Sequence, residues 1–538
     1  MPKQIFAFQY EVSEWGYVSG KAYADPFNNV ELDVVLTSSK GQWRVPTYWA
    51  GGNEWRVRFA PPEVGTYQVT TVCSDKSNPD LHGQASSLEA TAYRGNDPLL
   101  AHGPLRIAAS KRTIEHADGT PFFWLGDTWW MGLCKRWSWP DDFKLMIADR
   151  VAKGFTVIQI VAGLYPDMPP FDERGANEAG FPWEKDFTRI NPAYFDMADL
   201  RIQWLARSGL VPCIVSCWGY FLPLMGVEKM KQHLRNMIAR WGAYPVIWCL
   251  AGEATMPYYL SKNPEQDRQA QMDGWTEVGR YVRQVDPYHR LVTIHPTQVG
   301  RDQVKDESVL DINMLQTGHG GYGSISNTIV SVTRERSRQP VMPVLVGEVS
   351  YEGILHESTA EVQRLAFWAS MLSGAAGHTY GGNGIWQVNT RQKPFGASPW
   401  GGNWGSIPWE EVYRLPGSTQ LGLAKGLLQR YAWWRFEPHQ EWVKPAGGPQ
   451  NLNAPFAAGI PGEVRVIYFY SPTYQKPAEQ NQVLNIEPGI RYKAFFWRPR
   501  DGEEYDLGII KPDASGTWEI PIQPTLEDWV VVIESIRG

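Results

Sequence analysis

Hydrophobic and polar positions follow two different periods along this chain of 538 residues. Up to about residue 95, apolar and polar side chains alternate, as in Val30–Leu36, Trp55–Phe59 and Gly65–Val72. This alternation predicts strands with one buried face, and the turn residues Gly51-Gly52-Asn53 separate two of them. Short strands at this spacing predict a β-sandwich of immunoglobulin type over residues 1–95.

From about residue 105 the pattern changes to short apolar runs, each followed by a longer amphipathic segment. Apolar runs of this length predict strands that are buried on both faces, and the segments between them predict helices. About eight such units fill residues 105–434, which is the count of a (β/α)8 TIM barrel. The predicted strands are Phe122–Asp127, Phe155–Val161, Leu210–Ser216, Val246–Leu250, Leu291–His295, Val309–Gln316, Val344–Val346 and Gly377–Gly381.

Strand patterns return in the last part of the chain, from about residue 435. Strands are predicted at Val464–Tyr470, Tyr492–Trp497 and Trp529–Ile533, and Asp501-Gly502 is typical of a hairpin turn. These features predict a second β-sandwich over residues 435–538. The expected fold is therefore α/β, a TIM barrel flanked by two β-sandwich domains.

Composition narrows the function classes. The formal net charge is −6 and no run of Lys or Arg interrupts it, which argues against a nucleic-acid partner. No apolar run has the length of a membrane span and no signal peptide begins the chain, so we expect a soluble, cytoplasmic protein. A secreted protein whose leader had been removed would look the same. Homo-oligomer formation is left open.

The tryptophan and cysteine residues indicate which ligands to expect. The 26 Trp residues suit stacking on sugar rings, although most are expected to serve packing. The five Cys residues are scattered and are expected to be buried free thiols. Clusters of zinc-ligand spacing and an HExxH motif are absent from the sequence, so neither a metal nor another cofactor is expected.

Two of the predicted strands run directly into Gly-Glu, at Glu253 and at Glu348, 95 residues apart. Strand propensity does not favour Glu at the end of a buried strand. In a closed parallel barrel the ends of both strands lie at one mouth, where active sites are built. We therefore predict that Glu253 and Glu348 form a catalytic carboxylate pair, with Glu352 as a less favoured alternative to Glu348.

Carboxylate, histidine, tyrosine and tryptophan side chains also follow the other strands. Two carboxyl groups beside stacking aromatic rings suit glycoside hydrolysis, in which one acid protonates the leaving oxygen and the other attacks or directs water. Each of these side chains could instead be structural: a buried carboxylate, a wall histidine or a packed ring. Tyr165, Asp167 and Gln316 follow strands as well, without a predicted role. The predicted substrate-binding residues are Asp127, Trp129, Trp130, Trp218, His295, His319, Tyr351, His378, Tyr380, Asn383 and Trp386.

Two of these stretches resemble a known family. Phe122–Trp130 resembles the opening strand of the apiosidase-like family of TIM-barrel glycoside hydrolases, and Gly377–Trp386 is similar to that family's eighth strand. The N-terminal segment resembles the immunoglobulin-like domain that often precedes such barrels, and the C-terminal sandwich resembles the β-domain that often follows. The resemblance covers most of the chain and says little about the substrate.

The wider clan of retaining TIM-barrel hydrolases carries its acid/base after the fourth strand and its nucleophile after the seventh. By this resemblance Glu253 would be the acid/base and Glu348 the nucleophile. The chain departs from the clan at Gly252, where Asn is usual, so the contact to the sugar 2-hydroxyl must come from elsewhere. Apiosidase-like members often have Asp in place of Glu253, which favours an ordinary hexose or pentose glycoside over apiose.

The sequence thus predicts a retaining glycoside hydrolase that cleaves β-glycosidic bonds of plant- or microbe-derived oligosaccharides by double displacement. The alternatives are an inverting glycosidase and a catalytically silent carbohydrate-binding protein. The sugar, the linkage and the choice between endo and exo action are not predicted. The long, Gly-, Trp- and Pro-rich segment 381–408 would favour exo action if it walls off a pocket.

Overall fold

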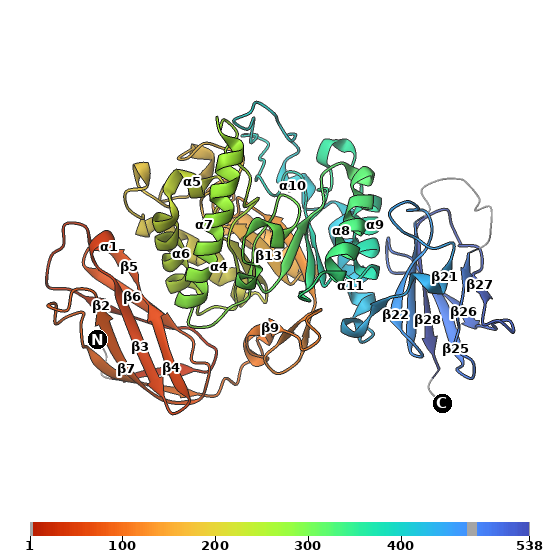
Figure 1. Ribbon diagram of the computed structural model, residues 1–538, viewed down its shortest axis with the longest axis horizontal. Coiled ribbons are helices and arrows are strands. Elements are labelled where there is room, and N and C mark those ends of the chain that lie inside the picture. Colours follow the sequence, from red (N-terminus) through yellow and green to blue (C-terminus); the bar gives the residue numbers. More distant parts are fainter. Residues whose placement is uncertain (1–3, 471–480, 537–538) are drawn as a thin grey trace.

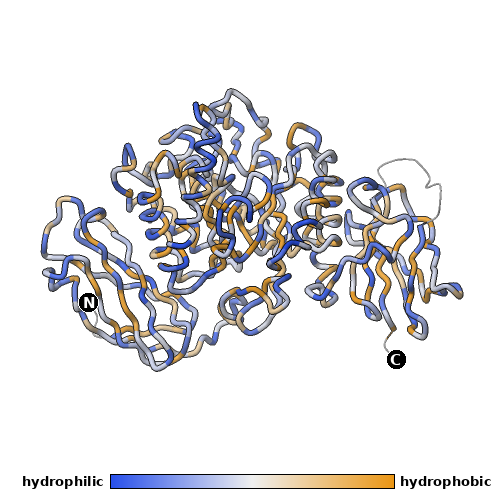
Figure 2. Tube along the Cα trace, in the orientation of Figure 1, coloured by the Kyte–Doolittle hydropathy of each residue, from blue (hydrophilic) through white to orange (hydrophobic). Residues whose placement is uncertain are grey.

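The structure, a computed structural model, describes residues 4–470 and 481–536. Figure 1 shows three bodies in a row, with an N-terminal β-rich part, a central barrel and a C-terminal β-rich part. Hydrophobic stretches concentrate along the strands at the centre of the barrel (Figure 2). The five Cys residues are free and buried. Within the described residues, no helix combines the length and the apolar character that a bilayer span needs.

The N-terminal part consists of two facing sheets. Their inner faces meet in a core that contains Val34, Leu36, Val57, Phe59 and Leu88, all fully buried. The predicted strands are present as β3 (Leu32–Ser38), β6 (Glu54–Phe59) and β7 (Gly65–Cys73), and buried and more exposed residues alternate along most of β7. The larger sheet has the order β1 (Gln4–Phe8), β8 (Ala85–Thr91), β7 (Gly65–Cys73), β3 (Leu32–Ser38), β4 (Gly41–Pro46), and the smaller β2 (Ser13–Val18), β6 (Glu54–Phe59), β5 (Tyr48–Gly51).

A short connection leads from this sandwich to the barrel. It contains α2 (Pro98–Ala101) and a three-stranded sheet of β9 (Leu105–Ile107), β10 (Ile114–His116) and β11 (Pro121–Phe122). Figure 1 shows β9 below the barrel, between the two sandwiches. The first barrel strand consequently begins at Trp124, two residues later than the sequence pattern predicts.

Eight parallel strands form a nearly closed barrel, which confirms the predicted fold class. Across the remaining gap between β16 and β17, the backbone N–H of Asp311 donates to the carbonyl of Val292 at 2.8 Å. Both faces of the strands are buried, as expected for a parallel sheet covered by helices. The order is β16 (Val292–Thr293), β15 (Ile247–Cys249), β14 (Val211–Val215), β13 (Val157–Val161), β12 (Trp124–Trp129), β19 (Gly377–Tyr380), β18 (Val344–Glu348), β17 (Asn313–Gln316).

The sixth strand is shorter than predicted. The prediction starts it at Val309, whereas β17 begins at Asn313. Val309 instead ends a 3-10 turn, Glu307–Val309, which the Asp306 carboxylate caps by accepting from the N–H of Ser308 at 3.1 Å. The helices of the barrel are α3 (Asp141–Ala152), α4 (Pro192–Arg207), α5 (Phe221–Met225), α6 (Val227–Trp241), α7 (Pro264–Val285), α8 (Ile325–Ser337), α9 (Ala360–Leu372), α10 (Trp409–Val412) and α11 (Pro416–Leu428).

The C-terminal part again has two sheets, and Gly502 turns the predicted hairpin between β25 and β26 with a φ of 80°. Buried ion pairs join both sandwiches to the barrel. Arg58 lies 2.6 Å from Asp199 of α4, and Arg364 of α9 lies 2.6 Å from Asp528. The sheets are β20 (Glu437–Pro438), β22 (Phe456–Ile460), β23 (Val464–Phe469), β28 (Trp529–Ser535), β25 (Tyr492–Trp497), β26 (Glu504–Ile509), and β21 (Val443–Lys444), β24 (Gln482–Val483), β27 (Trp518–Glu519).

Candidate active site

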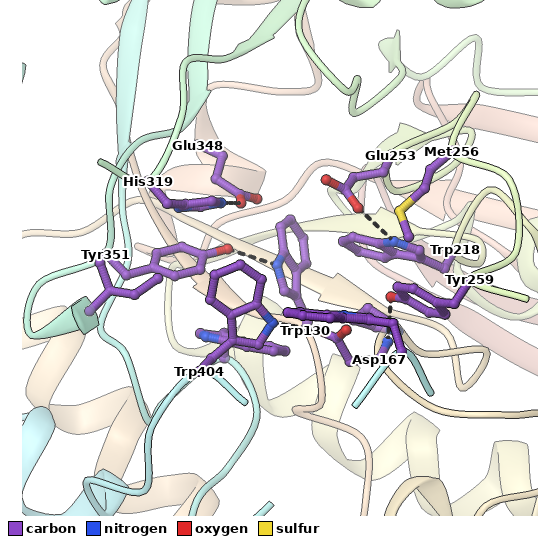
Figure 3. Close-up of a pocket in the computed structure, with 14 residues that line it drawn as sticks. Trp130, Asp167, Trp218, Glu253, Met256, Tyr259, His319, Glu348, Tyr351 and Trp404 are labelled. Carbon is purple, nitrogen blue, oxygen red and sulfur yellow. Dashed lines mark hydrogen bonds and ion pairs between the residues drawn. The ribbon is translucent and has the colours of Figure 1, made fainter. Parts of the chain in front are cut away.

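A cavity of about 290 Å³ opens at the C-terminal ends of the barrel strands. Segments that follow seven of the eight strands contribute to its wall, which is how a parallel barrel gathers residues from distant parts of the chain. The lining is mainly aromatic, with three carboxylates (Figure 3). The lining residues are Trp130, Pro166, Asp167, Trp218, Glu253, Met256, Tyr259, His319, Glu348, Tyr351, Ile354, Trp386, Trp400 and Trp404.

Glu348 is the last residue of β18 and only 4% exposed. Two imidazoles approach its carboxylate: His295 Nε2 lies 2.9 Å from Oε2, and His319 Nε2 lies 2.9 Å from Oε1. Burial alone would raise the pKa of Glu348, but the charges and contacts of the two histidines lower it to about 2. This carboxyl group is therefore ionised at ordinary pH.

Glu253 follows β15 and faces the same cavity. Its carboxylate accepts from Trp218 Nε1 at 3.1 Å and from Gln316 Nε2 at 3.0 Å. Burial raises the pKa of Glu253, and the negative charge of Glu348 raises it further. The two glutamates thus have pKa values that are pushed in opposite directions, the arrangement that separates an acid from a permanently charged carboxylate.

The backbone at Glu253 is unusual. Its φ is 40°, in the left-handed region that non-glycine residues rarely adopt. Gly252, which stands where the clan has Asn, packs against an indole, and a Cβ built there would lie 2.3 Å from the ring of Trp218. The Trp218 side chain therefore occupies the space that a side chain at position 252 would need.

Several predicted substrate-binding residues lie at the cavity. Trp130, Trp218, His319, Tyr351 and Trp386 line it. The Tyr351 hydroxyl accepts from Trp130 Nε1 at 2.9 Å and lies close to Glu348. Tyr351 and Trp386 stack, with ring centroids 6.2 Å apart.

Two more predicted residues support this wall from behind. His295 is fully buried, lies outside the cavity lining and contacts Glu348. The Asn383 side chain accepts from Trp386 Nε1 at 3.2 Å and donates to the carbonyl of Trp404 at 2.6 Å. Asn383 therefore holds two lining tryptophans in place.

Four predicted residues lie outside the cavity: Asp127, Trp129, His378 and Tyr380 are fully buried in the barrel. Asp127 Oδ2 accepts from Arg150 Nε and from Trp129 Nε1, both at 2.6 Å. The contacts of Asp127, Trp129 and Tyr380 fit the structural alternative, because their polar groups are engaged within the protein, whereas Nε2 of His378 is buried without a hydrogen-bond partner.

The Tyr380 hydroxyl donates to Glu352 Oε2 at 2.6 Å, and the backbone N–H of Gly417 donates to the same carboxylate at 3.1 Å. Glu352, the alternative to Glu348, is thus engaged below the cavity and does not line it. His378 lies beside Ser370, with Nδ1 3.3 Å from the hydroxyl oxygen.

Sequence reasoning missed other parts of the wall. Asp167 lies in the loop after the predicted strand Phe155–Val161, and Gln316, which donates to Glu253, ends the predicted strand Val309–Gln316. These placements were the available signal. Tyr259, Trp400 and Trp404 lie many residues beyond a strand end, so their arrival at the cavity depends on loop conformations that no pattern specifies. Within the described residues, no group of three or more His, Cys, Asp or Glu side chains is placed to hold a metal ion.

Comparison with known proteins identifies the barrel. Residues 108–435 match the family "Apiosidase-like, catalytic domain", and residues 7–74 match a domain of unknown function, DUF5060. The search of curated proteins gave no match.

Solved structures share the fold. A glycoside hydrolase is 22% identical with a TM-score of 0.65, covering 82% of this chain and 98% of its own. A glycoside hydrolase family 5 protein from Bacteroides vulgatus is 22% identical with a TM-score of 0.66, covering 81% and 94%. Another protein from Bacteroides vulgatus, 16% identical, has a TM-score of 0.71 over 99% of this chain and 100% of its own. Because the family match spans more than half of the sequence, the chain belongs to the apiosidase-like family and is a glycoside hydrolase.

Proposed function

We propose that this glycoside hydrolase is a retaining enzyme for β-glycosidic bonds, with Glu348 as nucleophile and Glu253 as acid/base. The observation that carries the proposal is the contrast between the two carboxyl groups. Glu348, between His295 and His319, has a pKa lowered to about 2, although burial alone would raise it, whereas burial and the charge of Glu348 raise the pKa of Glu253. Double displacement needs one carboxylate to attack while the other group holds a proton.

In the first step, an oxygen of Glu348 attacks the anomeric carbon and forms a covalent bond to it. The bond from that carbon to the leaving oxygen breaks, and Glu253 gives its proton to this oxygen. In the second step, Glu253 removes a proton from water as the water oxygen attacks the anomeric carbon. The bond to Glu348 breaks, and both carboxyl groups return to their starting states.

The remaining wall has supporting roles in this proposal. His295 and His319 keep Glu348 ionised, and the Tyr351 hydroxyl lies beside the same carboxylate. Trp386 and Trp218 offer faces on which a sugar ring can stack. The expectation of plant- or microbe-derived oligosaccharides as substrates rests on the family resemblance.

The decisive test is the stereochemistry of the product. Proton NMR during hydrolysis of an aryl β-glycoside should show the β-anomer as the first product, and a first product of α configuration would establish the inverting alternative. Glu348→Ala and Glu253→Ala should each lower kcat by several orders of magnitude, and azide should restore turnover in each. The glycosyl azide should be the α-anomer with Glu348→Ala and the β-anomer with Glu253→Ala, because azide then replaces the nucleophile in one case and water in the other.

A further inference from the structure

A third carboxylate, Asp167, lines the cavity apart from the glutamate pair. It follows β13 and is 8% exposed. Figure 3 shows Glu253 and Glu348 on one side of the cavity and Asp167 on another, near Tyr259 and Trp404. Like Glu253, Asp167 has a backbone in the left-handed region, with φ 54°. Conformations of this kind cluster at binding and catalytic sites, where surrounding contacts hold them.

Contacts from two other loops fix Asp167. Its backbone N–H donates to the Tyr259 hydroxyl at 3.0 Å, and its Oδ2 accepts from Trp404 Nε1 at 3.2 Å. Tyr259 and Trp404 are themselves lining residues. A carboxylate offers about four acceptor positions, so even if both neighbours donate to it, acceptor capacity remains for a ligand in the cavity.

One carboxylate at the cavity has no ion-pair partner among the described residues. Three carboxyl groups line the cavity, and His319, the single basic side chain among the described lining residues, pairs with Glu348. Glu253 holds a proton in the proposed mechanism, so the unpaired carboxylate is Asp167. Arg174 acts on Asp167 electrostatically, but its guanidinium pairs with Asp172 at 2.8 Å and lies outside the lining. A carboxylate on the ligand would therefore meet like charge at Asp167, which disfavours the binding of such a ligand.

We propose that Asp167 is a specificity-determining residue that accepts hydrogen bonds from hydroxyl groups of an uncharged sugar and disfavours sugars that carry a carboxylate. This inference rests on the proposed function, since it concerns the substrate of the same cavity. It assigns the substrate class by charge: neutral hexose or pentose units, and not uronic acids.

The test compares the wild type, Asp167→Asn and Asp186→Asn on two matched substrate pairs. One pair differs by a carboxylate on the sugar, an aryl glucoside against the aryl glucuronide. The other differs on the leaving group, a phenyl against a 4-carboxyphenyl glucoside. If glucosides are not cleaved, the galactoside and galacturonide replace them. Asp186→Asn removes a charge from the same segment between β13 and α4, at an exposed position outside the cavity. Asp186 also has a left-handed backbone, with φ 58°, so this variant is the matched control.

We expect the wild type and Asp186→Asn to favour the neutral member of at least one pair by roughly 100-fold in kcat/KM. Asp167→Asn should narrow that ratio at least tenfold and lower kcat/KM on the neutral substrate. A wild type that prefers the carboxylate in either pair, or an unchanged ratio in Asp167→Asn, would overturn the inference. Thermal melting of each variant verifies that it is folded.

The pH dependence of the same ratio is a second readout. Burial raises the pKa of Asp167 to about 6, with a further contribution from the charge of Glu253. The charged or titratable groups that act on Asp167 are Glu253, Arg174, Tyr259 and Tyr220. As the pH falls through this pKa, the negative charge is lost, so the wild-type ratio should shrink while that of Asp167→Asn stays flat. Titration of Glu253 changes kcat/KM on both substrates alike, so it leaves the ratio of the two values unchanged.

Failure of the proposed function would be distinguishable from failure of this inference. If the wild type cleaves no aryl glycoside in either anomeric configuration, the proposed function falls. Calorimetric titration of methyl glucoside and methyl glucuronide into the wild type and Asp167→Asn then tests the charge preference directly. Equal binding of both ligands by both proteins would contradict it.

Discussion

His319 Nε2 lies 2.9 Å from Glu348 Oε1, while His295 takes the other oxygen of the same carboxylate at the same distance. Burial alone would raise the pKa of Glu348, so the two imidazoles account for its fall to about 2. A carboxylate attacks only when ionised, so activity is lost as the pH falls through this pKa. The position of the acidic limb therefore depends on the histidines.

His319→Ala should move that limb of the kcat profile upward, because one of the two groups that lower the pKa of Glu348 is gone. At neutral pH we expect a loss of roughly 10- to 100-fold in kcat. The profile is measured at saturating substrate, which separates it from effects on binding. His356→Ala, at an exposed position, is the control and should keep the wild-type limb. An unmoved limb in His319→Ala would contradict the assigned role.

Glu253→Gln should affect substrates according to their leaving group. An aryl group of low pKa departs without help, so hydrolysis of a dinitrophenyl glycoside should fall far less than that of a phenyl glycoside. The alkaline limb of the pH–activity profile should also change. Burial and the charge of Glu348 raise the pKa of Glu253, and in the wild type the proton needed for catalysis is lost as the pH rises through this pKa. Equal losses on both substrates, measured as kcat/KM, would argue against an acid role.

Gly252→Ala tests whether the departure from the clan's Asn is imposed by Trp218. The new Cβ would lie 2.3 Å from the indole, so the ring that donates to Glu253 must shift. We expect a destabilisation of about 1–3 kcal/mol and a fall in kcat/KM. Gly323→Ala is the matched control, because a Cβ there meets nothing within 4 Å. Wild-type melting temperature and activity in Gly252→Ala would show that the ring adapts freely.

The fold was largely predictable because its signals are local and repeated. All eight predicted barrel strands are present, although the sixth begins later, where the Asp306 cap forms a turn that apolar periodicity does not reveal. The placement of Glu253 and Glu348 at one cavity follows from strand order alone, since both end parallel strands of the same barrel.

Distinguishing buried polar residues from cavity residues was harder. Asp127 and Glu352 stand beside strand ends, as Glu348 does, and differ only in what surrounds them. Their partners Arg150 and Gly417 come from the helical layer and are remote in sequence. Trp404 reaches Asp167 across 237 positions of chain, a contact set by loop conformation and not by period.

The last prediction concerns Asp127 and tests whether its role is structural or lies in substrate binding. Asp127 and Arg150 are both fully buried, with Nε and Oδ2 2.6 Å apart. Removing one partner of such a pair leaves an uncompensated charge, so Asp127→Ala should lower stability by roughly 3–5 kcal/mol. Replacing both partners with apolar residues, Asp127→Leu with Arg150→Met, should recover much of that loss because neither charge of the pair is left without the other.

The double variant distinguishes a structural role of Asp127 from a role in substrate binding. It should be folded, with a urea midpoint well above that of Asp127→Ala, and its KM on an aryl glycoside should stay near the wild-type value, since Asp127 lies outside the cavity. If Asp127 touched the sugar, the double variant would regain stability and still show a raised KM. A stable double variant with a strongly raised KM would therefore show that Asp127 contacts the substrate. The substrate-binding cavity would then extend deeper into the barrel than the residues that line it in this structure.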